Sequence, residues 1–310
     1  MGTEGALVSG RYRLDQPIGR GRAGIVWLAH DTLLNRTVAA KRMYVQPGQG
    51  QVVETAVREG RAASRVMHNN AITVYDVVLE GSEPWLVMEY VPSRSMADFL
   101  AEHGTLTPEQ TAFLGIQLAS ALTAAHQAGV LHRSLEPGNV LLADDGGVKV
   151  ADIGIWGAGP NSAFLAPEIA KGGLPEPASD AFSLGATLYV AVEGVPPYGD
   201  DGVLRQPQKA GQLTGALLKL LREDPLSRPT LADSITAFQA VTQGRQTAFI
   251  PPTAPAMPTV PIAVLDRPMV QTTAPVITIS PSKVRALILT VLAILCAAAI
   301  GIGITQLLFL

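Results

Sequence analysis

The stretch His132-Arg133-Ser134-Leu135-Glu136-Pro137-Gly138-Asn139 decides which fold this chain is expected to adopt, because other short motifs fall at fixed distances from it. Asp152-Ile153-Gly154 begins thirteen residues after Asn139, and Ala166-Pro167-Glu168 follows later in the chain. An Asp-x-Gly triplet alone is usually only a turn. Its distance from the 132–139 stretch makes it much more informative here.

A glycine triplet lies upstream, in Gly19-Arg20-Gly21-Arg22-Ala23-Gly24. Such a triplet is weak evidence by itself, because dinucleotide-binding folds carry a similar one just before a helix. The residues that follow Gly24, from Ile25 to Ala29, have a β-like pattern instead. We therefore predict a hairpin, whose glycines let the backbone approach phosphate groups closely.

Hydrophobic periodicity predicts a β-rich part followed by a helical part. Alternating apolar positions recur early in the chain, and a helical pattern covers residues 51–67. Strand-like runs follow at 72–79 and 85–90. Thr107 and Pro108 then form an N-cap signature ahead of an apolar helical run that reaches Ala128. We expect one domain over residues 11–242, preceded by a short tail at 1–10.

Taken together, these motifs resemble those of the protein kinases, closest to the actinobacterial type of bacterial Ser/Thr kinases. The resemblance covers roughly Arg11 to Phe238 and implies an α+β, two-lobed kinase fold with a β-rich N-lobe and an α-helical C-lobe. Its motifs are residues 19–26, 38–41, 58–63, 85–91, 132–139, 152–154, 166–168, 180–185 and 224–229.

The resemblance implies an ATP site with Mg²⁺. The glycine hairpin would cover the phosphates, and Lys41 would grip them while pairing with a helix glutamate, Glu59, with Glu54 as its rival. Asn139 and Asp152 would hold the metal. The residues that it assigns to the nucleotide are Gly19, Gly21, Gly24, Val26, Ala39, Lys41, Glu59, Met88, Glu89, Val91 and Leu141.

Several positions depart from the family pattern or lie away from the phosphates. Ile153 replaces an aromatic residue, and we expect it to pack on the small Ala63 in a looser stack. Asn161 stands where a threonine usually contacts the catalytic aspartate. Ser162 is the only hydroxyl in the short segment 154–165, so ordering of this segment by phosphorylation is not expected. The residues with a purely structural role in the resemblance are Glu168, Asp180 and Arg228.

The departure with the largest chemical consequence is Ser134, which stands where the family has its catalytic aspartate. A serine hydroxyl is nearly non-basic at neutral pH, and general-base catalysis is worth ~10²–10⁴-fold. Glu136 also replaces a lysine, which puts negative charge where positive charge would stabilise the transition state. Both changes affect phosphate transfer, whereas the nucleotide and metal residues are kept.

Three functions remain open from the sequence. The first is a pseudokinase that binds ATP and acts as a signalling or scaffold module. The second is a weak Ser/Thr protein kinase in which Glu136 serves as a substitute base. The third is an interaction scaffold that binds no nucleotide. Unidentified protein partners are expected in each case, among them active kinases or phosphothreonine-reading domains.

The C-terminal residues predict a membrane anchor. Eight prolines between residues 243 and 285 indicate an extended linker whose threonines are possible phosphorylation sites. Residues 286–310 carry no charge, and about 20 apolar residues suffice for a transmembrane helix. Lys283 and Arg285 precede this segment, so the positive-inside rule predicts a single-pass protein with a cytoplasmic kinase-like domain.

Composition sets the remaining limits. The net charge is only −3, which gives no electrostatic reason to expect nucleic acid as a partner. The single cysteine, Cys296, lies in the predicted anchor and has no internal disulfide partner. The first residues have neither a basic region nor an apolar core, so no signal peptide is expected.

Overall fold

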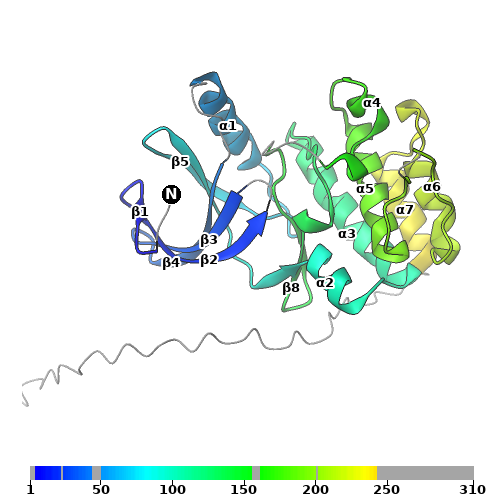
Figure 1. Ribbon diagram of the computed structural model, residues 1–310, viewed down its shortest axis with the longest axis horizontal. Helices are drawn as coiled ribbons and strands as arrows, with labels where there is room; N and C mark the ends of the chain where they lie inside the picture. Colours follow the sequence, from blue (N-terminus) through cyan, green and yellow to red (C-terminus); the bar gives the residue numbers. More distant parts are fainter. Residues whose placement is uncertain (1–3, 22–23, 44–49, 156–160, 200–201, 243–310) are drawn as a thin grey trace, which may run out of the picture. The chain divides into compact units, whose positions relative to one another are not determined.

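The computed structural model describes residues 4–21, 24–43, 50–155, 161–199 and 202–242. Within these ranges the chain forms a β-sheet part and then a helical part (Figure 1), as the hydrophobic pattern predicted. The predicted linker (243–285) and membrane segment (286–310) lie outside the described residues. In the described ranges, the structure contains no helix that is both long and apolar enough to span a bilayer.

Six antiparallel strands form the N-terminal sheet in the order β1-β2-β3-β4-β6-β5. Alternation sends one set of side chains inward, and Tyr12 and Leu14 on β2 are almost completely buried. The hairpin of β5 and β6 lies at one edge of the sheet and adjoins β4. The strands are β1 (Leu7–Val8), β2 (Tyr12–Gly21), β3 (Gly24–Asp31), β4 (Arg36–Arg42), β5 (Val74–Glu80) and β6 (Glu83–Met88).

Helix α1 (Gly50–Ala63) packs against β5 and β6. Gly60 makes this packing close, because a Cβ atom at that position would lie only 2.7 Å from the Val77 side chain and 3.2 Å from Leu86. The helix ends at Ala63, earlier than the residue 67 that periodicity predicted. Its outward positions remain exposed to solvent, whereas Ala56 and Ala63 are buried.

The helical part is built around α3 (Pro108–Gln127) and α5 (Pro177–Glu193), which pack against each other. Thr107 and Gln110 form a complete capping box at the start of α3, as the N-cap signature indicated. Helix α5 is apolar on nearly every side and lies within the largest core. The remaining helices are α2 (Met96–His103), α4 (Pro167–Ala170), α6 (Thr214–Leu220) and α7 (Leu231–Thr242).

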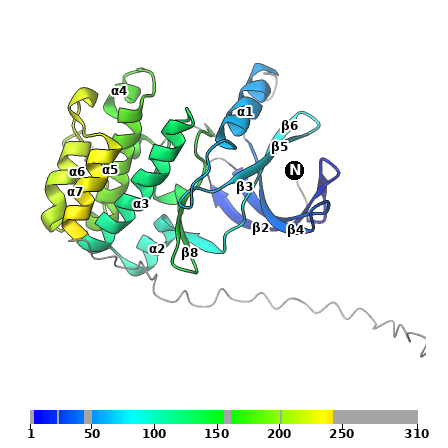
Figure 2. The ribbon, with the colours of Figure 1, turned by 180° about the vertical axis from the view of Figure 1, so that it is seen from behind.

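A three-stranded sheet, β7-β8-β9, lies between the six-stranded sheet and the helices (Figures 1 and 2). Strand β9 is joined to the segment after α1, because the Val150 amide donates to the Asn70 carbonyl (2.8 Å) and the Ile72 amide donates to the Val150 carbonyl (2.9 Å). This junction fixes the strand that leads to Asp152. The strands are β7 (Ser93–Ser95), β8 (Val140–Ala143) and β9 (Val148–Val150).

Candidate nucleotide and metal site

The glycine triplet forms the predicted hairpin between β2 and β3. Gly19 lies opposite Val26, and Gly21 lies opposite Gly24, with residues 22–23 outside the described ranges. Gly24 has a φ of +122°, and a Cβ atom there would approach the Arg42 carbonyl to 3.1 Å, so glycine fits this position best. A hairpin confirms that this is not the helix N-terminus of a dinucleotide fold.

Several apolar residues that the resemblance assigns to the nucleotide gather in one cluster. Ala39 and Met88 pair across β4 and β6 and are almost fully buried. Val26 packs against them from β3, and Leu141 joins from β8 of the other lobe, together with Val91. This cluster takes members from both lobes and offers apolar side chains of the kind that pack on the faces of a planar ring.

Lys41 lies beside Asp152, with its Nζ 2.5 Å from Oδ2 of the aspartate. The lysine is only 5% exposed, and Asp152 takes a left-handed backbone conformation, with φ of +59°. Val26 pairs with Lys41 across β3 and β4, so the lysine lies under the glycine hairpin. A cation, a carboxylate and a glycine hairpin therefore meet at the place expected for phosphates and metal.

Glu59 points toward the helical part of the protein, where its Oε1 accepts a hydrogen bond of 3.1 Å from Nη1 of Arg133. Glu59 was expected to pair with Lys41. In the structure the ion pair of Lys41 is with Asp152 and that of Glu59 is with Arg133. Glu54, the rival candidate, is exposed on the outer face of α1.

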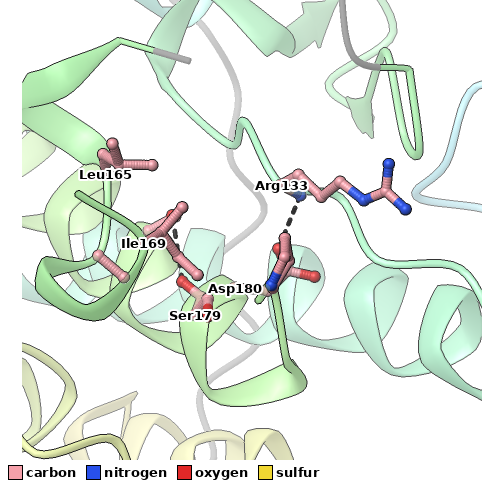
Figure 3. Close-up of a pocket in the computed structure, with 8 residues that line it drawn as sticks. Arg133, Leu165, Ile169, Ser179 and Asp180 are labelled. Atoms are coloured by element: carbon pink, nitrogen blue, oxygen red, sulfur yellow. Dashed lines mark hydrogen bonds between the residues drawn. The ribbon is translucent and has the colours of Figure 1, made fainter. Parts of the chain in front are cut away.

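The loop at 132–139 is held from below by Asp180 on α5. The Asp180 carboxylate accepts hydrogen bonds of 2.8 Å from the backbone amides of His132 and Arg133 and lies 2.7 Å from Nε2 of His126. Arg133 has a φ of +70°, an uncommon conformation whose strain these bonds offset. Figure 3 shows the Arg133 backbone facing Asp180 while its guanidinium points away.

Asn139 closes the same loop from the other end. Its side-chain Nδ2 donates to the backbone carbonyl of Ser134 (2.8 Å). Its backbone carbonyl accepts from the amide of Ala151 (2.8 Å), next to Asp152. The backbone at Ser134 is thereby fixed between two anchored segments. Glu136 is half-buried immediately before the short helix η1 (Pro137–Asn139). Ser134 thus stands in a well-ordered position, but without a basic side chain.

The apolar residues around Asp152 differ from the expectation. Ile153 was expected to pack on Ala63, but it belongs to the core of the helical part, together with Val130. Ile155 takes the place in the cluster that contains Ala63 and Ala56 of α1. The chain turns between them at Gly154, which has a φ of +76°. Glycine is needed there, because a Cβ atom would lie 2.6 Å from the Val130 side chain.

The predicted structural residues after the loop form a tight ion pair. The Nη1 and Nη2 atoms of Arg228 donate to the two carboxylate oxygens of Glu168 at 2.7 Å, and Arg228 is almost fully buried. Burial alone would raise the pKa of Glu168, but the hydrogen bonds from Arg228, the backbone and Ser179, together with the charge of Arg228, outweigh burial and hold the pKa below its usual value. This pair confirms the structural role that the resemblance gave to both residues.

A small hollow lies between residues 165–175 and α5 (Figure 3). Leu165, Ile169 and Pro175 form its apolar wall, and Ser179 and Asp180 line the opposite side. Its polar side chains are engaged: the Ser179 hydroxyl donates to Glu168 at 3.0 Å. Within the described residues, the carboxylate and hydroxyl groups that line the hollow are therefore already hydrogen-bonded.

Lys149 was missed by the sequence analysis. Its Nζ lies 2.7 and 2.8 Å from the two carboxylate oxygens of Glu89, and Glu89 also accepts from the Thr73 amide at 3.2 Å. This ion pair ties Glu89, the residue that follows β6, to β9. Lys149 lies three residues before Asp152. Only its position near the Asp-x-Gly triplet could have singled out Lys149, and a lone lysine on a strand is usually solvated.

Comparison with known proteins gives one family model, described as a protein kinase domain, that matches residues 12–239. The chain is 40% identical over 192 residues to serine/threonine-protein kinase PknK of Mycobacterium tuberculosis, which covers 58% of this chain and 17% of that protein. It is 28% identical over 270 residues to serine/threonine-protein kinase PrkC of Bacillus subtilis, covering 76% and 42%. The match therefore spans less than half of either relative.

Solved structures show the same fold. The kinase domain of Mycobacterium tuberculosis PknI superposes with a TM-score of 0.68 at 24% sequence identity, covering 77% of this chain and 99% of that one. At this identity the likeness supports the fold and carries no residue roles.

Proposed function

The chain belongs to the protein kinase domain family, and we propose that it is a membrane-anchored pseudokinase that binds ATP with Mg²⁺, lacks the catalytic aspartate at Ser134, and acts as a signalling or scaffold module. One observation carries this proposal. Lys41 Nζ lies 2.5 Å from Oδ2 of Asp152, where the resemblance expects phosphates and metal, while a serine, Ser134, occupies the position of the proton acceptor.

The nucleotide half of the site supports binding. Adenine would lie between Ala39 and Leu141, in the apolar cluster that also contains Met88. Lys41 would contact phosphate oxygens, and Asp152 with Asn139 would supply oxygen ligands of the kind that Mg²⁺ prefers. When bound, Mg-ATP supplies the phosphoryl group and neutralises charge between its phosphates. The donor set of this chain fits both components.

The transfer half of the site supports the loss of activity. In a protein kinase an aspartate orients the substrate hydroxyl and accepts its proton, which is worth ~10²–10⁴-fold in rate. Ser134 cannot accept a proton at neutral pH, although its backbone is held by Asn139. Glu136 brings a carboxylate to a place where negative charge opposes the transition state. Asn161, in place of a threonine, is a third change in the same half.

The membrane anchor and the partners are supported by the sequence. The uncharged segment 286–310 has the length of a bilayer span, and the proline-rich segment 243–285 would separate it from the kinase domain. Lys283 and Arg285 favour a cytoplasmic domain. Threonines in that linker would be targets for an active kinase, and their phosphates would suit an arginine-rich reader domain.

A thermal-shift titration with ATP, with and without Mg²⁺, tests the proposal. We expect stabilisation that saturates with ATP, grows with Mg²⁺, and is lost in Lys41→Met and Asp152→Asn. Absence of stabilisation in the unchanged protein would favour the scaffold that binds no nucleotide. Sustained transfer of labelled phosphate that Glu136→Ala abolishes would favour the weak kinase instead.

A further inference from the structure

The outer face of α1 and the turn that follows its end carry three exposed arginines. Arg58, Arg61 and Arg65 are all exposed and follow one another at intervals of three and four residues, so they lie on one side of the helix end. Within the described ranges none of them forms an ion pair, whereas seven arginines elsewhere in the domain do. Arg58 donates a long side-chain hydrogen bond, of 3.5 Å, to the Thr55 hydroxyl.

This basic face contrasts with the charge of the rest of the domain. Residues 1–242 contain 19 basic and 25 acidic residues, so three neighbouring arginines oppose the net sign of the domain. Glu54 is the acidic residue on the same face, one turn earlier. Concentrated positive charge on an otherwise acidic surface attracts anionic groups and repels basic ones.

We propose that this arginine face of α1 binds an acidic segment of a partner protein, in which carboxylate or phosphate groups recur along an extended chain. The inference rests on the proposed scaffold function and gives it a docking surface. Arg58 and Arg61 lie one turn apart on the helix, and Arg65 lies in the turn that follows its end at Ala63.

The charge of the remaining chain argues against an internal occupant. Residues 243–310 contain four basic residues and one acidic residue, Asp266. This segment therefore lacks the complementary charge. An acidic partner instead gains charge-assisted contacts with up to three guanidinium groups. Each guanidinium group can bind a carboxylate or a phosphate through paired donors.

The position of the face suits a docking role. Glu59, the neighbour of Arg58 in sequence, faces a different side of the helix and reaches Arg133 of the 132–139 loop at 3.1 Å. The helix thus presents one side to the site and another to solvent. A partner on the outer side leaves the nucleotide residues uncovered, so docking and nucleotide binding can be measured separately.

Fluorescence anisotropy with a labelled peptide of alternating glutamate and serine tests this proposal. We expect the triple variant Arg58→Glu/Arg61→Glu/Arg65→Glu to bind at least about tenfold more weakly at low salt, since three exposed ion pairs become repulsive contacts. A matched control, Lys171→Glu/Lys209→Glu/Lys219→Glu, changes net charge equally at exposed sites elsewhere and should bind like the unchanged protein.

Equal loss in both triple variants, or no loss in either, would overturn the proposal. So would binding to vesicles rich in phosphatidylserine that depends on the three arginines when the peptide does not bind, because a membrane would then be the partner. ATP titration of the arginine variant distinguishes this failure from failure of the proposed function. Retained nucleotide binding with lost peptide binding is the expected combination.

Discussion

Replacing Ser134 by aspartate should restore phosphate transfer, because the surrounding loop is already positioned. Asn139 fixes the Ser134 carbonyl at 2.8 Å, and Asp180 fixes the two preceding amides at the same distance. An aspartate at this position would therefore enter an ordered backbone and present its carboxylate without moving the loop. Since general-base catalysis is worth ~10²–10⁴-fold, we expect a gain in transfer rate within that range.

The assay is transfer of labelled γ-phosphate to a generic basic protein substrate at saturating Mg-ATP. Ser134→Asn is the matched control, because its side chain has almost the shape of aspartate but accepts no proton. A second variant, Ser134→Asp/Glu136→Lys, should be faster again, because it also removes a negative charge that opposes the transition state. Equal rates in the aspartate and asparagine variants, with ATP still bound, would refute the reasoning.

Three further changes test ion pairs of the domain. Arg228→Met should lower the free energy of unfolding in urea by about 3 kcal/mol, because the Glu168 carboxylate would lose its buried partner; a change near zero would contradict the pair's structural role. Lys149→Met removes the cation that pairs with the Glu89 carboxylate and should weaken ATP binding several-fold by calorimetry, since part-exposed pairs contribute about 1 kcal/mol or less; unchanged affinity would separate this pair from the nucleotide site. The hydrogen bond from Arg11 lowers the pKa of Asp31 to about 2, so its stabilisation is complete above the ordinary value of 3.8 and is lost as pH falls toward 2; Arg11→Met should move acid unfolding, followed by circular dichroism, to higher pH, and an unmoved transition would count against this pair.

The fold and the assembly of the site could be predicted from the sequence because both depend on local patterns in a fixed order. The glycine hairpin, the capped start of α3 and the Glu168–Arg228 pair follow from motifs whose partners lie at expected spacings. The apolar cluster around Met88 likewise follows from strand order. These features are determined by short stretches of chain together with their sequence order.

Partner choice among charged and apolar side chains could not be predicted. Whether Glu59 meets Lys41 or Arg133 depends on how far α1 lies from the helical part, and helix position is set by packing over the whole sheet. The exchange between Ile153 and Ile155 has the same origin, because a turn at one glycine decides which side chain reaches α1. Spacing along the sequence gives candidates for such contacts and leaves the choice to tertiary packing.

The most direct test of the account follows bound and transferred phosphate in one sample. The protein is dialysed to equilibrium against γ-labelled ATP with Mg²⁺, and label is measured as retained nucleotide and as phosphate joined to protein. The account predicts one ATP retained per chain, dependent on Lys41, with negligible transfer. Transfer at roughly 1–100 per second, as in active kinases, or no retained nucleotide, would contradict it.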